Sequence, residues 1–516
     1  MYYQVSMTLA SDKEWQKIGR HDHHGIALPL FSLRNPQNSG VGEFLDLLPI
    51  INWCKDVGFD LIQLLPLNDS GTESSPYSAL SAMALHPLYL SLWALPFLDR
   101  MPQAEELLSQ LQQCSSSQRF DYQKVYHAKL KFLKSYFEHT FEAIQTLLPY
   151  QEFVSNQKWL HNYAQFSYLK EKNALKPWWK WKITEVNNEN ELNFYKMTQY
   201  LAFSQWAKVK EEAESKHIYL KGDIPILINR DSACVYAHQD LFNLEFSAGA
   251  PPDMYSQEGQ SWGFPIYAWK KQEETGFSWW KERLHVAEKL YHLYRLDHVV
   301  GFFRIWVMPE GMTAKEGYYI PADEKEWLSQ GDKIMRMLLS SSSMLPIAED
   351  LGNVPPQVRL KLRELGVPST KVYRWERRWN TDRTYIPVEE YIPESMTTVS
   401  THDSSTLSGW WQDDGEEVIS FCQFKGWEYV PEFSFEKRFE ILHDSHRSGS
   451  LFHINLLQEY LNLFPELSWN NPDDERINIP AVVLERNWTY RFRPTVEEII
   501  SHKKLKSIMK GFAALP

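Results

Sequence analysis

The stretch YRLDHVVGFF, residues 294–303, decides the fold of this chain. Its apolar run carries an Arg, an Asp and a His and stops at a Gly, a pattern typical of a buried strand that brings charged side chains to one edge of a sheet. Apolar residues at three- and four-residue spacing predict an amphipathic helix over 277–293, just before it. Because burying charge is costly, such a strand needs a functional reason. A helix, a strand and a charged strand end in succession indicate an α/β barrel, whose reactive residues lie at the carboxyl ends of the strands.

Two later stretches repeat this form. LPIAEDLG at 345–352 is a short apolar run that ends in an acidic pair, and TTVSTHD at 397–403 is a β-branched run closed by His-Asp. Roughly fifty residues separate successive acids, which leaves room for a helix and a long loop or an extra strand between them. Asp297, Glu349 and Asp403 are therefore predicted to converge in space.

Composition narrows the class of protein. The chain has 516 residues, 43% of them hydrophobic, which is normal for a (β/α)8 barrel with insertions and predicts an ordered globular protein. The formal charge of −12 argues against a nucleic-acid partner, which would need a clustered basic face. The 21 Trp, 26 Tyr and 27 Phe fit a carbohydrate ligand, because aromatic rings pack on the apolar faces of sugars, but large cores also use aromatics.

The sequence predicts neither a metal site nor a membrane-spanning segment. The four cysteines lie far apart without CxxC pairing, so no zinc site or disulfide framework is expected. The start, MYYQVS, lacks the pattern of a signal peptide and no run is long enough to span a membrane, so the expected compartment is the cytoplasm. Metal binding at His21, His23 and His24 is not expected, because Asp22 is the only acid close to them in the sequence. No cofactor is predicted.

The remaining strands define the organisation of the chain. Strands are expected at 24–33, 61–67 and 218–228, and the strand signal disappears between about 101 and 193, where helical patterns replace it. We therefore divide the chain into a first part of the barrel at 20–100, a mainly helical insertion at 101–193 and the remainder of the barrel at 194–516. The Gly- and Pro-rich segment 246–269 lacks regular periodicity and is expected to be an ordered loop over the rim of the barrel.

Several motifs resemble those of one family. RLDH at 295–298, AEDLG at 348–352 and THD at 401–403 are similar to the catalytic segments of the 4-α-glucanotransferases (amylomaltases, or disproportionating enzymes) of the α-amylase clan. The segments LKGDIPI at 220–226, GAPPD at 249–253 and RINIP at 476–480 also resemble this family. The resemblance covers nearly the whole chain in the right order, and it implies a (β/α)8 barrel without cofactor.

The resemblance also implies roles for the acids. A retaining cleavage of a glycosidic bond needs one carboxylate to attack the anomeric carbon and a second, protonated one to donate to the leaving oxygen, about 5–5.5 Å away. The family match makes Asp297 the nucleophile, Glu349 the acid/base and Asp403 the stabiliser of the transition state. Arg295 points to the same side of the strand as Asp297 and can hold it ionised.

Seven residues are expected to contact substrate or to support the site. They are Arg295, His298, His402, Tyr77, Asp223, Asn478 and Trp262. For Tyr77, Asp223 and the two histidines, ordinary packing or a satisfied buried polar group is the competing interpretation, and Asn478 is expected either to contact sugar or to hold the rim. A transferase must also exclude water, and the loop that includes Trp262 is the expected cover. A hydrolase of the same clan uses the same acids and remains an alternative; a catalytically silent glycan-binding protein is a weaker one, since it need not retain all four charged residues.

Departures from the commoner bacterial pattern favour one branch of the family. Val299 and Val300 stand where that pattern has Phe-Arg after Asp-His, and the segment RWER at 374–377 is also distinctive. These variants resemble the branch with the plant cytosolic disproportionating enzyme, whose amino-terminal starch-binding modules have no counterpart here. The resemblance implies maltose or short maltooligosaccharides as donors and a glycogen-like glucan as acceptor.

Only about 25 residues follow Arg491, too few for the β-sandwich of ~100 residues found after the barrel in typical amylases.

Overall fold

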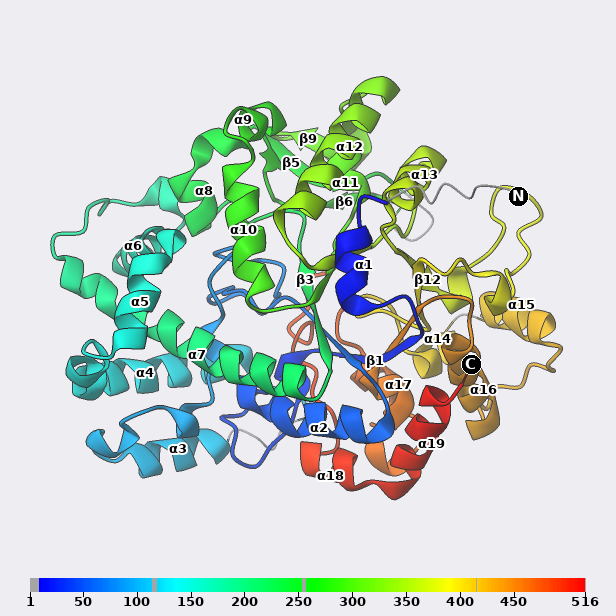
Figure 1. The fold of residues 1–516 in the computed structure, drawn as a ribbon, viewed down its shortest axis with the longest axis horizontal. Helices are drawn as coiled ribbons and strands as arrows, with labels where there is room; N and C mark the ends of the chain where they lie inside the picture. The colour runs from blue at the N-terminus through cyan, green and yellow to red at the C-terminus, as the bar shows by residue number, and fades with distance from the viewer. Residues whose placement is uncertain (1–8, 114–117, 253–256, 414, 516) are drawn as a thin grey trace.

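The computed structural model describes residues 9–113, 118–252, 257–413 and 415–515. At its centre eight parallel strands are hydrogen-bonded in the order β11-β8-β3-β2-β1-β14-β13-β12 (Figure 1). Neighbours in the sheet are successive barrel strands along the chain, except for β1 and β14, the first and the last, which pair with each other. The two end strands also meet, because the Ala348 N–H donates to the Pro368 carbonyl and the Thr370 hydroxyl donates to the Ala348 carbonyl, both at 2.8 Å. This order and this closure confirm the predicted (β/α)8 barrel.

The barrel strands are short and buried along almost their whole length, because side chains fill the interior and helices cover the outside. Their bounds are β1 His23–Leu28, β2 Leu61–Leu64, β3 Tyr219–Ile224, β8 Leu293–Leu296, β11 Leu345–Ala348, β12 Ser369–Val372, β13 Ser395–Thr398 and β14 Phe452–Leu456.

Helices surround the barrel, and local sequence sets their ends. The helix α2 stops at Gly58, which adopts the left-handed conformation that glycine tolerates (φ 84°). The helix α12 begins after Asp323, whose carboxylate accepts the N–H groups of Lys325 and Glu326. The helices that follow or precede the barrel strands are α1 Asp12–Ile18, α2 Leu47–Val57, α7 Asn193–Ser215, α8 Ala233–Ala237, α9 Trp269–Glu274, α10 Ser278–Glu288, α11 Val300–Phe303, α12 Glu324–Ser341, α13 Pro356–Leu365, α14 Leu407–Asp413, α15 Gly415–Lys425, α16 Phe435–His446, α17 Leu457–Leu461, α18 Val496–Ser501 and α19 Lys503–Ala513.

Between β2 and β3 the chain forms helices that gather on one side of the barrel (left in Figure 1). They are α3 Ala104–Gln112, α4 Tyr122–Ile144, α5 Leu148–Asn156 and α6 Lys158–Lys172. A buried ion pair of 2.7 Å joins Lys129 of α4 to Glu43, which precedes α2. A buried charge without its partner is costly. This ion pair therefore favours close packing of the helices on the barrel. Their status as a separate unit stays a prediction.

Two local expectations are corrected. The segment 246–269 contains strands, not only loop: β5 (Phe246–Ala250) pairs antiparallel with β6 (Gln260–Ser261) and with β9 (Ile305–Pro309). A second sheet in the order β10-β9-β5-β6 results, with β10 at Tyr318–Ile320, and β4 (Phe242–Asn243) pairs with β7 (Ile266–Tyr267). The stretch after Asp297 is not strand but the short helix α11, so β8 ends before the acid. Asp253 and Tyr255 of the expected rim loop lie outside the described residues.

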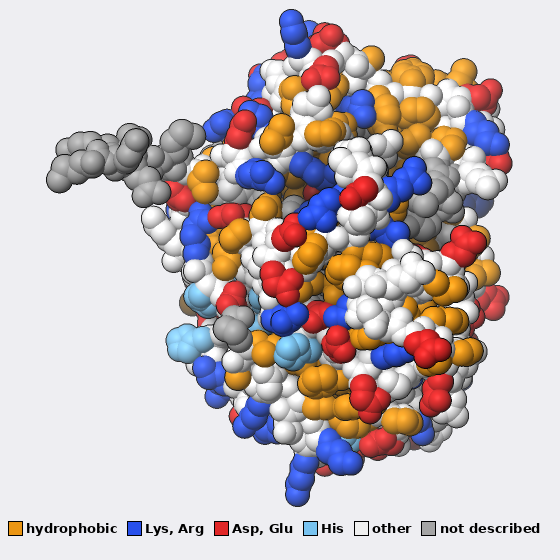
Figure 2. All heavy atoms as spheres, turned by 90° about the vertical axis from the view of Figure 1, so that its right-hand side faces the viewer, with side chains coloured by type: hydrophobic (Ala, Val, Ile, Leu, Met, Phe, Trp, Pro, Cys, Tyr) orange, Lys and Arg blue, Asp and Glu red, His pale blue; other side chains and the backbone are white. Residues whose placement is uncertain are grey.

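The surface mixes charges of both signs. Figure 2 shows basic and acidic side chains interspersed over the face turned to the viewer. Among the helices of the described ranges, none combines the length and the hydropathy that crossing a membrane requires.

Candidate active site

Three neighbouring barrel strands bring acids to one end of the barrel. Asp297 follows β8 directly, Glu349 follows β11 directly, and Asp223 lies near the end of β3. In the register of the sheet, Asp223 and Ile347 are the partners of Arg295 on either side. Because parallel strands end at the same rim, acids far apart in the sequence meet around the Arg of the central strand.

Arg295 is the centre of this group. Its Nη1 lies 2.8 Å from Asp297 Oδ1 and 3.0 Å from Asp223 Oδ2, and its Nη2 lies 3.7 Å from Glu349 Oε2. Burial lowers the pKa of this guanidinium, but the Asp223 and Asp297 carboxylates outweigh burial and raise the pKa well above its ordinary value. A single permanent cation therefore contacts three carboxyl groups.

Glu349 is held by backbone groups. Its Oε2 accepts the His298 N–H and its Oε1 accepts the Leu351 N–H, both at 2.9 Å. His298 adopts a left-handed conformation (φ 45°), which is costly for a residue with a side chain and is typical of functional sites. Burial raises the pKa of Glu349 to about 7, against the opposing effect of Arg295 and with a further contribution from Asp297. A carboxyl group with this pKa can both donate and accept a proton near neutral pH.

Asp403 has a different environment. It follows β13 after a short turn; its Oδ2 lies 3.3 Å from His402 Nε2 and its Oδ1 accepts the side-chain amide of Asn478 at 2.7 Å. Burial would raise its pKa, but the charge and hydrogen bond of His402, with Asn478, outweigh that effect and lower the pKa to about 2. The side chain is 44% exposed, against 13% for Glu349, so Asp403 is the more accessible acid. It stays ionised where a ligand can reach it.

Tyr77 connects the group around Arg295 with the surroundings of Asp403. Its hydroxyl donates to Asp223 Oδ2 at 2.8 Å and lies 3.0 Å from His402 Nε2, while its ring stacks on the His402 ring with centroids 5.5 Å apart. Contacts therefore run without a break from Asp403 through His402, Tyr77 and Asp223 to Arg295.

The structure brings all ten predicted site residues into one group. Trp262 joins it through the His298 ring, which it meets edge-on at 5.0 Å between centroids. The members are Asp297, Glu349, Asp403, Arg295, His298, His402, Tyr77, Asp223, Asn478 and Trp262. Their proximity is observed; their individual roles stay predictions.

Two neighbours were missed in the sequence. Trp488 (φ 63°) packs against Tyr77 and His402, with ring centroids 5.5 and 5.8 Å away. Lys221 lies inside the barrel, where its Nζ donates to Gln63 Oε1 at 2.7 Å, and burial, with Arg295 nearby, lowers its pKa to about 7. The available signal for Lys221 was its position two residues before Asp223, which places both on the same face of β3. Trp488 lies in a segment similar to the family, but nothing local to it indicated the contact.

The fold and this group of residues define an enzyme built on a (β/α)8 barrel, with its site at the carboxyl ends of the strands. Comparison with known proteins identifies its kind. A family model described as 4-alpha-glucanotransferase matches residues 28–497. A 4-alpha-glucanotransferase of Chlamydia muridarum is 43% identical over 509 residues, which are 96% of this chain and 96% of the relative. The chain therefore belongs to the 4-alpha-glucanotransferase family.

Two further proteins are similar to this chain. The 4-alpha-glucanotransferase DPE2 of rice (Oryza sativa subsp. japonica) is 25% identical over 660 residues, covering 94% of this chain and 68% of the plant protein. A solved amylomaltase from Streptococcus agalactiae in complex with acarbose superposes with a TM-score of 0.81 at 24% identity, covering 96% of this chain and 99% of that one, which supports the fold. The family resemblance read from the motifs is confirmed, and transfer is favoured over hydrolysis as the activity.

Proposed function

We propose that the chain moves α-1,4-linked glucosyl units or segments by a retaining double displacement in which Asp297 is the nucleophile, Glu349 the acid/base and Asp403 the stabiliser of the transition state. The observation that carries the proposal is that one guanidinium, Arg295, contacts both Asp297 and Glu349. The shared cation supports the proposal that these two carboxyl groups act on one glycosidic bond.

In the first half of the reaction, Asp297 attacks the anomeric carbon and a covalent glycosyl-enzyme forms. Glu349 enters this step protonated and gives its proton to the leaving glycosidic oxygen, for which a pKa of about 7 is suitable. The ion pair with Arg295 holds the Asp297 carboxylate in place. Asp403, accessible and ionised, binds sugar hydroxyls and favours the positive charge that develops on the ring.

In the second half, a glucan hydroxyl replaces the leaving group. Glu349, now ionised, removes the proton of that hydroxyl, whose oxygen attacks the anomeric carbon and releases Asp297. Water would end this step in hydrolysis, so transfer requires an acceptor held in position and a covered site. Trp262, between β6 and β7 and packed on His298, is the side chain that we assign to this cover.

The polar residues around the acids fit sugar recognition. His402, Asn478 and Tyr77 present nitrogen and oxygen atoms beside Asp403 and Asp223, and aromatic faces of Tyr77 and Trp488 lie next to them. Rings beside hydrogen-bonding groups match the apolar faces and hydroxyls of glucose. We assign Arg295, Asp223 and His298 to the support of the acids.

For substrates we propose maltose or short maltooligosaccharides as donors and a glycogen-like glucan as acceptor, with the cytoplasm as the compartment. The similarity to the rice enzyme supports this branch.

Product analysis with maltotriose tests the reaction. We expect glucose and a ladder of longer maltooligosaccharides, with the number of reducing ends constant because each cleaved bond is replaced. Reducing ends that grow in step with bond cleavage would show a hydrolase, and no products at all would show a silent binding protein.

A second assay tests the substrates. Maltose with glycogen should be converted faster than maltotriose alone; equal or better use of the trisaccharide alone contradicts the proposed branch and leaves the transfer reaction itself standing.

A further inference from the structure

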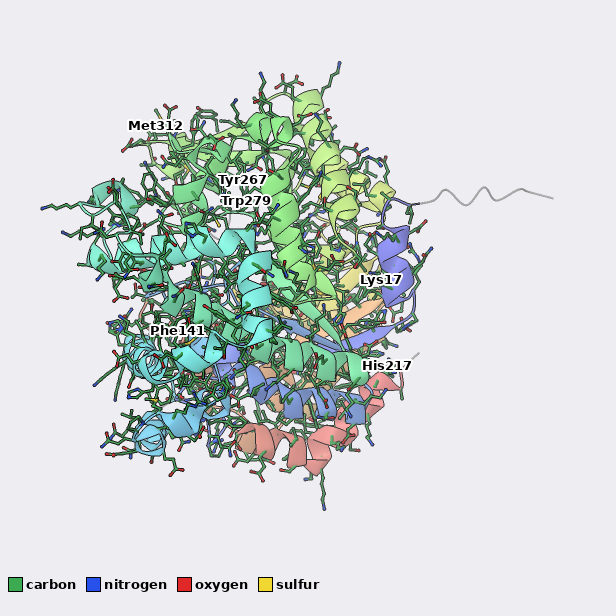
Figure 3. The ribbon with its side chains drawn as sticks, turned by 60° about the vertical axis from the view of Figure 1, so that its left-hand side comes forward. Lys17, Phe141, His217, Tyr267, Trp279 and Met312 are labelled. Atoms are coloured by element: carbon green, nitrogen blue, oxygen red, sulfur yellow. The ribbon has the colours of Figure 1, made fainter. Side chains whose placement is uncertain are left out.

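A second group of ionisable side chains lies at the opposite end of the barrel, the amino ends of the strands. His23 begins β1, Asp60 immediately precedes β2, and His21 lies in the turn before β1. Figure 3 shows this end at the right, where Lys17 of α1 and His217, just before β3, lie at one edge of the molecule, while Met312 and Phe141 lie on the far side. We call this end the floor of the barrel and the end with Arg295 the rim.

Each nitrogen of the His23 ring faces an oxygen atom, one from the Asp60 carboxylate and one from the Gly19 carbonyl. His23 Nδ1 lies 2.7 Å from Asp60 Oδ2, and its Nε2 lies 3.3 Å from the Gly19 carbonyl, to which only an N–H can donate. With Nε2 protonated, a neutral imidazole has a lone pair on Nδ1 that faces a carboxylate oxygen. The contact is favourable only when a proton or a metal cation lies on Nδ1.

Two further atoms point to a cation larger than a proton. Asp60 Oδ1 is buried and has no hydrogen-bond partner among the residues that the structure describes, so half of this carboxylate is without a donor there. His21 Nδ1 lies 3.0 Å from the Asp22 carbonyl, which occupies that nitrogen as a donor and leaves Nε2 with its lone pair. One ligand atom from each of His21, His23 and Asp60 lies within 4.8 Å of the others.

The turn before β1 is shaped around the His21 ring. Gly19 has φ 97°, and a Cβ at this position would lie 2.8 Å from His21 Cδ2 and 2.9 Å from Nε2. A residue other than glycine would therefore push the ring away from the pair. On the other side, Phe452 stacks on the His23 ring with centroids 5.0 Å apart and fixes the plane of that ring.

We propose that His21, His23 and Asp60 bind a divalent transition-metal ion of the Zn2+ class, with water completing a tetrahedral set. Two imidazoles and one carboxylate are ligands that such ions prefer, at about 2.0–2.2 Å. The ion lies between His23 Nδ1 and the Asp60 carboxylate, the exposed His21 ring closes onto it, and the His23–Asp60 contact opens slightly. The Gly19 carbonyl accepts from His23 Nε2 and fixes its tautomer, as the outer partner of a metal-bound histidine does.

The charged side chains near His21 are compatible with a bound cation. Arg20 is the adjacent cation, and it is paired with Glu394 at 2.9 Å and with Asp12 at 3.2 Å. Asp22 adds a carboxylate next to His21. The sequence argued against a metal here because Asp22 was the only acid close by, and the fold supplies Asp60 from the start of the next strand. The ion would tie the entry of β1 to the entry of β2, away from the rim.

Metal titration of the untagged, EDTA-dialysed protein tests this site. We expect one equivalent of ZnCl2 to bind in calorimetry, one equivalent of CoCl2 to give the visible absorption of tetrahedral Co2+, and Zn2+ to raise the melting temperature. His21→Ala and Asp60→Asn should each weaken Zn2+ binding at least tenfold. His161→Ala is the matched control, because His161 is also exposed and lies 3.9 Å from a glutamate, Glu189, yet is outside the group.

The site is refuted if the wild type binds no Zn2+, or if His21→Ala binds it as tightly as the wild type. His21→Ala decides the matter even if Asp60→Asn fails to fold, because the His21 side chain is exposed and its removal leaves the core intact. The transfer activity of His21→Ala should stay unchanged with and without Zn2+, which separates this proposal from the one for the rim.

Discussion

The rim and the floor of this barrel both contain buried ionisable side chains, but they accommodate them in different ways. At the rim, Asp223, Asp297 and Glu349 surround Arg295, so that buried carboxylates have a cation to pair with. Inside the floor, His24 and His446 face each other with their Nδ1 atoms 2.8 Å apart. One of these nitrogens must donate and the other must accept, so at least one of the two rings is neutral.

The histidines of the floor are more deeply buried than most of the charged side chains of the rim, and their partners differ. Burial, with the neighbouring His453, lowers the pKa of His24 to about 4, and burial, with His24 and His453, holds the pKa of His446 well below its ordinary value. At the rim, burial raises the pKa of Asp223 and of Glu349, and the permanent charge of Arg295 opposes that effect. The difference teaches that the partner, as well as the depth, sets the pKa of a buried group. Side chains that stay charged can take part in the reaction, whereas the neutral histidine rings contribute to packing.

The largest expected effect is on catalysis at the rim. Asp297→Asn should reduce transfer from maltotriose by at least about 10⁴-fold, because the nucleophile is lost while the shape is kept. Initial rates of glucose release measure this. Asp22→Asn makes the same chemical change at the floor and should leave the rate within about twofold of the wild type. A comparable loss in both variants would show that the two ends are not functionally distinct.

The next effect is on the charge balance of the rim. Arg295→Met should lower the free energy of unfolding by about 3–5 kcal/mol at pH 7, since it leaves buried carboxylates without their cation. Arg295→Lys should lose less stability but still lose activity, because an ammonium cannot contact three acids in the geometry of a guanidinium. Urea unfolding and initial rates measure the two quantities. Equal stability of Arg295→Met and the wild type would contradict a role for Arg295 in holding these acids.

A smaller effect concerns Glu349 and pH. The folded pKa of about 7 lies above the ordinary 4.5, so the stability associated with this group is fully present below pH 4.5 and is lost as pH rises through 7. Glu349→Gln cannot ionise, so it should be more stable than the wild type at pH 8, by at most about 3 kcal/mol, and about equally stable at pH 4. Urea midpoints at both pH values test this.

The activity of the wild type should follow the same ionisation. The first half-reaction requires protonated Glu349, so single-turnover rates should fall as pH rises above about 7. A rate that stays constant from pH 6 to 9 would remove Glu349 from the role of proton donor.

The smallest effect belongs to the floor. The pKa values of His24 and His446 are lowered on folding, so their contribution to stability is fully present above the ordinary value of 6.5 and is lost as pH falls toward the folded pKa, which is about 4 for His24. In EDTA, the free energy of unfolding should fall by about 1.4 kcal/mol per pH unit for each such histidine between pH 6 and 5. His446→Gln should show a slope smaller by about one proton, even if its stability at pH 7 is lower; an unchanged slope would mean that His446 is already charged in the folded protein.

Much of the rim could be read from local pattern. Asp297 and Glu349 each follow a short apolar run directly, and a buried strand that ends in a carboxylate is recognisable without any contact being known. The family resemblance then added Tyr77, Asn478 and Trp262, which have no such local signal. Neither Lys221 nor Trp488 was found, because a lysine in a strand and a tryptophan in a loop have many ordinary explanations.

By itself, the sequence determined that this chain forms a (β/α)8 barrel with three acids at strand ends, because hydrophobic periodicity and the order of the strands are local properties of the chain. Tertiary structure alone decided which groups share a partner. It placed three carboxyl groups around Arg295, joined Asp403 to Asp223 through Tyr77, and brought Asp60 to His23 at the floor. Pairing depends on distances between atoms on different strands, and those distances exist only after the barrel has closed.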